Sequence, residues 1–339
     1  MPQRNLFQYL LVTAKGLAMG AADVVPGVSG GTIAFISGIY EELIETIHNI
    51  DLGFFKIWKK EGFLMAWKHY NLPFLLALFA GIFISILSFA KLITWLLEVY
   101  PIMVWSFFFG LVIASIVFVG QQISNWRLSL IVALIVASIL SYLITIADPI
   151  GSPESTWFLF LAGFVAIIAM ILPGISGAFI LLLLGAYSTV IGFVTQLGEG
   201  ISTLNGTLFL NAFGKLLIFG VGAIIGLKMF SRVLNWMFKH HKNLILAVLT
   251  GFMIGALNKI WPWKEVLQYR MSHTGEKIPF IERSVFPQNY EGDPQILYAV
   301  VFAVIGFLTI FLLERIAVKK APKPPKREPS PPKTSNFES

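Results

Sequence analysis

Two short runs rich in proline and glycine interrupt long apolar segments of this chain, and they constrain its fold more than any other feature. The first is VPGVSGG at residues 25–31, and the second is LPGISGA at residues 172–178. Proline lacks the backbone N–H donor and glycine admits non-helical angles, so each run predicts a break in a helix. Inside a bilayer, the freed backbone groups are tolerated only where protein covers them or where they line a polar cavity.

The bilayer setting follows from the composition. Of the 339 residues, 56% are hydrophobic and 13% are charged, whereas soluble domains have about 25% charged residues. We therefore expect a polytopic membrane protein. The chain has no cysteine, which excludes disulfides, thiolate catalysis and cysteine-built metal sites. We expect neither a metal ion nor a cofactor.

Apolar segments occur in the same order twice. Each half begins with a broken segment, at 7–47 and at 157–194, and continues with three unbroken ones. A helix needs about 17 to 25 residues to cross a bilayer, so three crossings are expected in each half. Their expected ranges are 72–97, 101–119, 128–147, 216–238, the short 243–257, and 296–316.

The two halves also match residue by residue. When residues 16–47 are aligned with 163–194, ten of the 32 positions are identical. The matched pairs include Pro26 with Pro173, Gly27 with Gly174, Ser29 with Ser176, Gly30 with Gly177, Gly38 with Gly185, and Tyr40 with Tyr187. Further on, Gly81 pairs with Gly222, Lys91 with Arg232, Trp95 with Trp236, and Gly110 with Gly251. Chance rarely matches Lys with Arg or Trp with Trp, so we infer an internal duplication, as in many secondary transporters.

The basic loops set the expected orientation. Lys and Arg gather at the N-terminus, in the loop after the first broken segment, near Arg127 and at 239–242, and such loops face the cytoplasm. Basic loops fall on one face of the membrane and the other loops on the opposite face only if each broken segment enters and leaves the bilayer on the same side. Each half then has an odd number of crossings, so the second half is inverted.

The expected fold class is therefore an all-α polytopic membrane protein with two inverted-topology repeats, each a re-entrant helical hairpin plus three transmembrane helices. The repeats are residues 1–150 and 151–318, with an outer loop at 261–294. Residues 319–339 form a proline- and lysine-rich tail, expected to be disordered and cytoplasmic. The tail carries six Lys or Arg against two Glu, more than half of the net charge of +7, so the basic balance does not indicate nucleic acid.

The residues that follow each break form a candidate anion site. Unpaired N–H groups and the positive end of the helix dipole meet at a helix N-terminus, and a serine there can cap the helix or donate to an oxyanion. The candidate ligands are Gly27, Ser29, Gly30, Gly31, Thr32, Gly174, Ser176 and Gly177, with Pro26 and Pro173 making the breaks. The alternative is that the glycines let helices pack closely and the serines only cap.

Charged residues inside apolar spans are a second signal, because each costs about 2.5 to 3.5 kcal/mol at a helix centre and tends to be functional. Lys91, Lys228 and Arg232 lie in such spans, although Lys91 could also extend its ammonium group to the interface. Asp23 precedes the first break by three residues. It is either a helix cap, a partner for Lys15, or a proton or cation coupling site.

A serine hydrolase is a less favoured alternative. Residues 27–31 satisfy the G-x-S-x-G pattern, but a nucleophilic serine needs a base within hydrogen-bond reach. The five histidines (48, 69, 240, 241 and 273) all lie in loops or at the ends of spans. A lysine base remains conceivable, and labelling with a fluorophosphonate would reveal an active serine.

Residues 20–32, GAADVVPGVSGGT, together with LPGISG at 172–177, resemble the PopT-type polyprenyl-phosphate translocases. The resemblance covers about residues 5–318. It implies a bacterial or archaeal plasma-membrane protein, a transporter and not an enzyme, that returns undecaprenyl phosphate from the outer to the inner leaflet for reuse in cell-wall and surface-polymer assembly.

With this substrate, our hypothesis is that both breaks hold the phosphate and that Lys91 and Arg232 receive it from either leaflet. Asp23 is a candidate for proton coupling. The sequence has no nucleotide-binding loop, so we expect no drive by ATP. A small-anion transporter or channel on the same scaffold, and a non-transporting membrane scaffold, stay open as alternatives. Oligomeric state, energy source and prenyl chain length are not fixed by the sequence.

Overall fold

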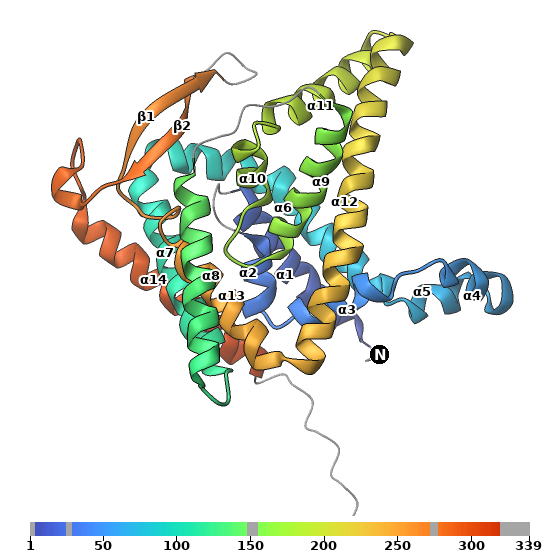
Figure 1. Cartoon of the computed structure of the whole chain (residues 1–339), viewed down its shortest axis with the longest axis horizontal. Coiled ribbons are helices and arrows are strands. Elements are labelled where there is room, and N and C mark those ends of the chain that lie inside the picture. Colours follow the sequence, from blue (N-terminus) through green and yellow to red (C-terminus); the bar gives the residue numbers. More distant parts are fainter. Residues whose placement is uncertain (1–3, 25–28, 148–154, 272–276, 319–339) are drawn as a thin grey trace, which may run out of the picture.

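The computed structural model describes residues 4–24, 29–147, 155–271 and 277–318, and these ranges are mostly helical (Figure 1). The helices of the first half are α1 (Leu6–Val24), α2 (Gly30–Ile36), α3 (Tyr40–Asn49), α4 (Gly53–Glu61), α5 (Phe63–His69), α6 (Leu72–Val99), α7 (Pro101–Gln121) and α8 (Leu128–Ile146).

The second half follows the same order, with α9, α10 and α11 in the places of α1, α2 and α3. Its elements are α9 (Thr156–Ile171), α10 (Gly177–Leu183), α11 (Tyr187–Ser202), α12 (Gly206–His240), α13 (Lys242–Ala256), β1 (Lys264–Met271), β2 (Lys277–Ser284), a 3₁₀ turn (Pro287–Asn289) and α14 (Ile296–Val318). The short helices α4 and α5 project sideways from the helical body (Figure 1).

Several helices have the length and composition of membrane spans. Among the described residues, α7, α8 and α12 pass both criteria, and two bent pairs would raise the number to five: α5 with the first part of α6, and α10 with α11. The helices α9, α13 and the first part of α14 are apolar but shorter. The six expected crossings thus correspond to α6, α7, α8, α12, α13 and α14. Large apolar side chains remain exposed on their outer faces, as bilayer contact requires.

Glycines allow α1 and α6 to cross at backbone contact. A Cβ atom at Gly16 would lie 2.2 Å from the carbonyl oxygen of Leu78, and one at Gly81 would lie 2.1 Å from that of Thr13. Close approach through small residues is the usual way in which helices associate inside a bilayer, where lipid is as apolar as leucine. These two glycines therefore fix how the first hairpin sits on α6.

The second half repeats this crossing between α9 and α12. A Cβ atom at Gly163 would lie 2.2 Å from the carbonyl oxygen of Phe219, and one at Gly222 would lie 2.1 Å from that of Phe160. Gly163 and Gly222 are the residues that the sequence alignment matched with the glycines of the first crossing. The local packing of the two halves is therefore alike at matched positions.

Two further crossings join the halves to each other. The helix α7 packs on α14, where a Cβ atom at Gly110 would lie 1.8 Å from the carbonyl oxygen of Ala303. The helix α13 packs on α8, where a Cβ atom at Gly251 would lie 2.4 Å from that of Leu134. Gly110 and Gly251 are also a matched pair. Each half thus packs its middle helix against the last helix of the other half.

The short helices α2 and α10 end in the same way. Gly38 and Gly185 follow them with φ of +72° and +67°, angles that glycine adopts without steric cost. After α2, Ile39 N–H donates to the Ala34 carbonyl and Gly38 N–H to the Phe35 carbonyl, both at 3.0 Å. After α10 the two equivalent bonds are 2.9 Å long. This is the Schellman motif, formed twice at matched residues.

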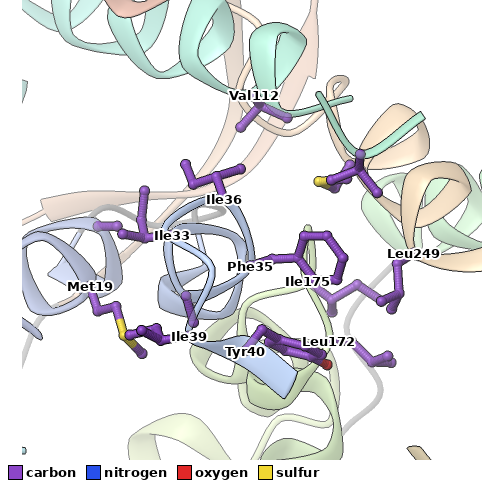
Figure 2. Packing of buried hydrophobic residues seen from close by; sticks show 14 of the residues in the cluster. Met19, Ile33, Phe35, Ile36, Ile39, Tyr40, Val112, Leu172, Ile175 and Leu249 are labelled. Carbon is purple, nitrogen blue, oxygen red and sulfur yellow. The ribbon is translucent and has the colours of Figure 1, made fainter. Parts of the chain in front are cut away.

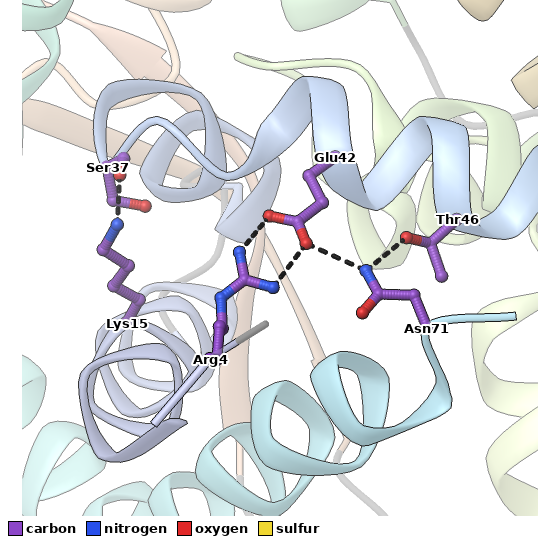
Figure 3. A network of polar contacts seen from close by, with 6 residues as sticks. All are labelled: Arg4, Lys15, Ser37, Glu42, Thr46 and Asn71. Atoms are coloured by element: carbon purple, nitrogen blue, oxygen red, sulfur yellow. Dashed lines mark hydrogen bonds and ion pairs between the residues drawn. The ribbon is translucent and has the colours of Figure 1, made fainter. Parts of the chain in front are cut away.

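A polar network holds the two ends of the first hairpin together (Figure 3). The guanidinium of Arg4, just before α1, donates two hydrogen bonds of 2.7 and 2.5 Å to the carboxylate of Glu42 on α3. The side-chain amide of Asn71 donates to Glu42 at 2.8 Å and to the hydroxyl of Thr46 at 3.3 Å. The first hairpin therefore starts and finishes at the end of the molecule where the N-terminus lies (Figure 1).

The second hairpin starts and finishes at the other end. In Figure 1, α11 and the start of α12 lie opposite the N-terminus, near the level of the β-strands. The ammonium group of Lys215, in the early part of α12, donates to the hydroxyl of Thr156 at the start of α9 at 3.5 Å. The two broken segments thus enter the helical body from opposite ends.

The segment expected as an outer loop at 261–294 departs from the all-α class, because it folds into the antiparallel pair β1–β2. Two tryptophans attach this hairpin to the helices. The indole of Trp261 donates to the carbonyl of Val285, and that of Trp263 to the carbonyl of Pro294, both at 2.8 Å. Trp263 also packs among buried residues at the starts of α7 and α14, so the hairpin is anchored to the helical body.

The crossing of α9 and α12 offers a matched pair of variants on one helix. A Cβ atom at Gly222 meets a carbonyl oxygen at 2.1 Å, whereas one at Gly220 meets nothing within 4 Å. We expect Gly222→Ala to lower the unfolding temperature of the detergent-solubilised protein by several degrees. Gly220→Ala should leave it unchanged or raise it, because alanine gains about 1 kcal/mol over glycine in a helix. Equal melting temperatures for the two variants would contradict the observed crossing.

Candidate functional site

The second break is a tight turn. The N–H of Ile175 donates to the carbonyl of Leu172 at 3.4 Å, with Pro173 second in the turn and Gly174 third, at a φ of +89°. Proline followed by a left-handed glycine is the pattern of a type II turn. A Cβ atom at Gly174 would also lie 2.9 Å from Cα of Met253. Both the backbone angle and the contact with α13 therefore require glycine here.

Pro26 and Gly27 of the first break lie outside the described residues, so only the residues on either side of it can be described. The carboxylate of Asp23, near the end of α1, accepts the N–H of Gly30 at 2.7 Å. Asp23 therefore caps the start of α2, as one of its expected roles required. It does not pair with Lys15 in the structure, since the Lys15 ammonium donates to the turn after α2 at 2.6 Å.

Both helices that follow the breaks begin with the expected serine caps. The hydroxyl oxygen of Ser29 accepts the N–H of Gly31 at 3.1 Å, and that of Ser176 accepts the N–H of Phe179 at 3.4 Å. Both serines have extended backbone angles, as cap residues do. One role foreseen for each serine is thus present in the structure.

The two breaks touch through two hydrogen bonds. The hydroxyl of Ser29 donates to the carbonyl of Leu172 at 3.4 Å, and the N–H of Gly174 donates to the hydroxyl of Thr32 at 3.0 Å. Ser29 and Thr32 are 2% and 1% exposed; the bond from Ser29 is buried and the bond to Thr32 is partly buried. Backbone groups freed by the second break are therefore satisfied by side chains of the first.

Tyr40, at the start of α3, adds a third bond of the same kind. Its hydroxyl donates to the carbonyl of Ile171, the last residue of α9, at 3.1 Å. The last carbonyls of a helix have no partner inside it, so the first hairpin supplies the C-terminal cap of α9. Figure 2 shows Tyr40 and Phe35 lying beside Leu172 and Ile175 of the second break. No sequence pattern indicated this role, because Tyr40 stood out only as the residue that matches Tyr187 in the repeat.

Four of the amides expected to bind an anion are engaged within the protein. Those of Gly30, Gly31 and Gly174 donate to Asp23, Ser29 and Thr32, as described, and the N–H of Thr32 donates to the Ser29 carbonyl at 2.9 Å. An oxyanion at this place must replace internal hydrogen bonds.

Two glycines of the predicted site also serve packing. A Cβ atom at Gly31 would lie 2.7 Å from the carbonyl oxygen of Ile171, and one at Gly177 would lie 2.8 Å from that of Ala166. Their lack of a side chain brings the start of α2 onto the second break and the start of α10 onto α9. One alternative expected for the glycines was that they let helices pack closely, and the structure shows such packing at both Gly31 and Gly177.

Two of the three charged residues of the apolar spans, Lys228 and Arg232, have no contact with the breaks among the described residues. The ammonium of Lys228 donates to the carbonyls of Ile47, His48 and Ile50, so it caps the C-terminal end of α3. Arg232 lies one helical turn further along α12 and is exposed, without a hydrogen bond or ion pair to the residues the structure describes. The side chain of Lys91, on α6, lies outside the described part of the structure.

A small, mostly apolar pocket adjoins the second break, and one cation, Lys259, lines it. It lies between the second break, α8 and the segment after α13, and its lining includes Ser141, Thr145, Gly174, Ser176, Phe179 and Lys259. The Lys259 ammonium sits 4.6 Å from the centre of the Phe179 ring. Lys259 lies at the end of an apolar segment, where a lysine usually marks only the interface, so its position gave no signal.

Two lysines share one carboxylate beside this pocket. The ammonium groups of Lys259 and Lys264 each lie 3.6 Å from the same oxygen of Glu282. Lys264 is also 3.4 Å from the centre of the Trp105 ring, a cation–π contact. Burial lowers the pKa of Lys264 to about 8, with Glu282 opposing that effect, so Lys264 keeps its proton at neutral pH.

Metal ligation has no support in the described residues, which hold no group of three or more His, Asp or Glu side chains placed to bind an ion. What the structure does bring together is a set of apolar helices of membrane-spanning character, with two broken helices that meet inside the protein. Discontinuous helices that meet in this way are typical of secondary membrane transporters.

Sequence comparisons identify the family. The profile of the VCA0040-like family, described as undecaprenyl phosphate translocase-like, matches residues 19–278, and the chain belongs to this family. It is 44% identical over 315 residues to a polyprenyl-phosphate transporter of Vibrio cholerae serotype O1, covering 92% of this chain and 98% of that protein. It is 32% identical over 263 residues to a polyprenyl-phosphate transporter of Staphylococcus aureus, covering 73% and 84%.

Both relatives are named as transporters and not as enzymes. No solved structure matches the chain. The resemblance carried by the two glycine-rich motifs is thereby confirmed.

The bond between Thr32 and Gly174 predicts a pair of stability effects. Thr32→Val keeps the side-chain shape but leaves the partly buried N–H of Gly174 without its acceptor, at a cost of about 1 kcal/mol. Thr32→Ser keeps the acceptor and loses one methyl group. We expect thermal unfolding in detergent at a clearly lower temperature for Thr32→Val than for Thr32→Ser, and faster amide exchange at Gly174. The reverse order would show that the bond does not support the fold.

The low pKa of Lys264 predicts how stability depends on pH. Between pH 8 and the ordinary lysine value of 10.5, the unfolded chain holds more protons at this group than the folded protein. Stability contributed by this group therefore rises with pH through that window and is constant below it. The rise in melting temperature from pH 7 to pH 10 should be smaller in Lys264→Met than in the wild type. An identical rise would exclude the shift.

Proposed function

We propose that this protein carries undecaprenyl phosphate, or a related polyprenyl phosphate, from the outer to the inner leaflet of the plasma membrane, so that the lipid carrier can be reused in cell-wall and surface-polymer assembly. The family description and the names of both relatives support the substrate. The direction follows from the resemblance noted in the sequence. The observation that carries the mechanism is the pair of hydrogen bonds between the breaks.

The substrate sets the physical requirement. A phosphate monoester carries about −1.5 to −2 charges at neutral pH, and moving such a group through hydrocarbon unaided is prohibitive. The protein must offer a polar path for the headgroup while the prenyl chain stays in the bilayer. A site built from broken helices meets this need, since non-helical backbone at membrane depth is possible only inside protein or beside a polar cavity.

The scaffold we propose is a pair of inverted repeats, residues 1–150 and 151–318. Three features support it. The glycine crossings α1–α6 and α9–α12 fall at matched residues. The Schellman motifs at Gly38 and Gly185 are the same. The two hairpins enter from opposite ends (Figure 1). Inverted repeats give a transporter two related states, open to either side of the membrane.

In this mechanism the breaks exchange partners. In the state described here, Ser29 and Thr32 bind the second break, and their bonds close the path between the hairpins. A phosphate oxygen can replace the Leu172 carbonyl as acceptor for Ser29, and it can accept the Gly174 N–H in place of Thr32. Ser176 offers a second hydroxyl on the other side. The headgroup thus takes over bonds that the protein already makes.

We assign the receiving roles to Arg232 and Lys91. Arg232 is exposed on α12 near the end of α3 and has no acidic partner among the described residues, so its guanidinium is free for a phosphate, which it binds in bidentate fashion. Lys91 is its matched residue in the first half. Asp23 is our candidate for coupling, because it holds the first amide of α2 and protonation would release that bond.

The basic ends of the molecule support the orientation. The N-terminus, the turn between α7 and α8, and the turn between α12 and α13 lie at one end in Figure 1, with the β-strands at the other. Lys and Arg in short loops face the cytoplasm. We therefore place both termini in the cytoplasm and the β-strands outside.

Reconstitution in liposomes tests the function. A fluorescent short-chain polyprenyl phosphate in both leaflets, with a membrane-impermeant quencher outside, measures movement between leaflets. We expect transport by the wild type and a loss of about tenfold in Arg232→Ala, the equivalent of one charge-assisted hydrogen bond of about 1.4 kcal/mol. Arg127→Ala is the matched control, because Arg127 is also exposed but precedes α8, away from the breaks.

One outcome would overturn the proposed function, and another would overturn only the role assigned to Arg232. Flux of inorganic phosphate or chloride without lipid movement would make the protein a small-anion transporter or channel. An unchanged rate in Arg232→Ala, with the control also unchanged, would remove Arg232 from the path while leaving lipid transport in place.

A further inference from the structure

We propose that Lys259, Lys264 and Glu282 form a second oxyanion site, at the mouth of the pocket beside the second break, where the phosphate headgroup of the lipid first binds on the side of the β-strands. This inference rests on the proposed function. It assigns the binding step to residues outside both glycine-rich motifs, in a segment for which the sequence indicated no chemistry.

The charge balance of the cluster favours an anion. Its two ammonium groups share one carboxylate oxygen at 3.6 Å each, so the three side chains together carry one net positive charge. Both distances exceed the length of a hydrogen bond. The Lys264 ammonium is buried and has no hydrogen-bond partner among the described residues. A buried cation without a full set of acceptors is costly, so Lys264 retains Glu282 as its partner when a headgroup binds the more exposed Lys259.

The position of Lys259 links this charge to the break. Its side chain is 17% exposed, more than the 8% of Lys264, so Lys259 is the lysine of the cluster that an incoming headgroup can reach. The ring of Phe179, which its ammonium faces, belongs to the first turn of α10, and Ser176 lines the same pocket. A phosphate held by Lys259 is therefore next to the serine of the second break.

The pocket itself is narrow. Its volume is about 10 Å³, roughly the least space that one water molecule needs, so a phosphate group binds at the mouth and not at the floor. When the headgroup binds, it replaces Glu282 as the ionic partner of Lys259, while Glu282 stays paired with Lys264. The carboxylate thus competes with the substrate for one lysine, which makes binding reversible.

Substitutions with opposite effects test this site. Farnesyl phosphate binding to the detergent-solubilised protein is measured by titration calorimetry, with farnesol as the uncharged probe. We expect Lys259→Gln to weaken binding about tenfold, the worth of one charge-assisted contact. Glu282→Gln should strengthen binding, because it removes the competing carboxylate. Lys259→Arg should bind within a few fold of the wild type. Farnesol should not distinguish the variants.

A matched lysine provides the control. Lys242 pairs with Glu41 at 2.7 Å on the opposite end of the molecule, so Lys242→Gln should leave farnesyl phosphate binding unchanged. The unfolding temperature of each variant is also measured, so that a loss of binding is counted only for variants that remain folded. Lys259→Arg shows whether the site tolerates a substitution that keeps the charge.

The results separate this inference from the proposed function. Equal binding of farnesyl phosphate by the wild type, Lys259→Gln and Glu282→Gln would overturn the site and leave lipid transport standing. No binding by the wild type would overturn both. Inorganic phosphate binding as tightly as farnesyl phosphate would assign the cluster to a soluble anion and overturn its role for a lipid headgroup.

Discussion

The structure depends on one requirement: backbone groups released by a helix break inside apolar surroundings must find partners. The second break exposes the carbonyls of Ile171 and Leu172 and the N–H of Gly174, and the first hairpin supplies a partner for each, from Tyr40, Ser29 and Thr32. The second break therefore depends on the first hairpin, since each unsatisfied polar group costs several kcal/mol in hydrocarbon. The contact between the breaks is therefore a condition for the fold before it is a feature of the site.

The same bonds suit a transporter for a phosphorylated lipid. Side-chain hydroxyls and turn amides that bind each other can equally bind phosphate oxygens, so substrate and protein compete for the same donors. In the proposed mechanism, a substrate that replaces internal bonds separates the hairpins at little net cost, because bonds are exchanged and not lost. Opening of the proposed path then depends on the presence of the headgroup.

Features fixed by local sequence were predictable, and features fixed by distant partners were not. The Pro173-Gly174 turn, the serine caps and the Gly38 and Gly185 motifs each follow from neighbouring residues, and the duplication made them visible twice. The use of Lys228 as a cap for α3, and the gathering of Lys259, Lys264 and Glu282 beside the second break, depend on segments far apart in the chain. No periodicity or motif encodes such meetings. The β-strands were missed because a charged loop gave no clear alternation.

The exchange of helices between the halves bears on how the protein is made. The middle helix of the first half, α7, finds its glycine-lined partner only in α14, the last described helix of the chain, and α8 waits likewise for α13. When the ribosome has finished the first half, both helices are already in the membrane with their small-residue faces unpaired. These two crossings are therefore completed only after the later helices have been made, and a chain that stops after α8 lacks the packing partners of both α7 and α8.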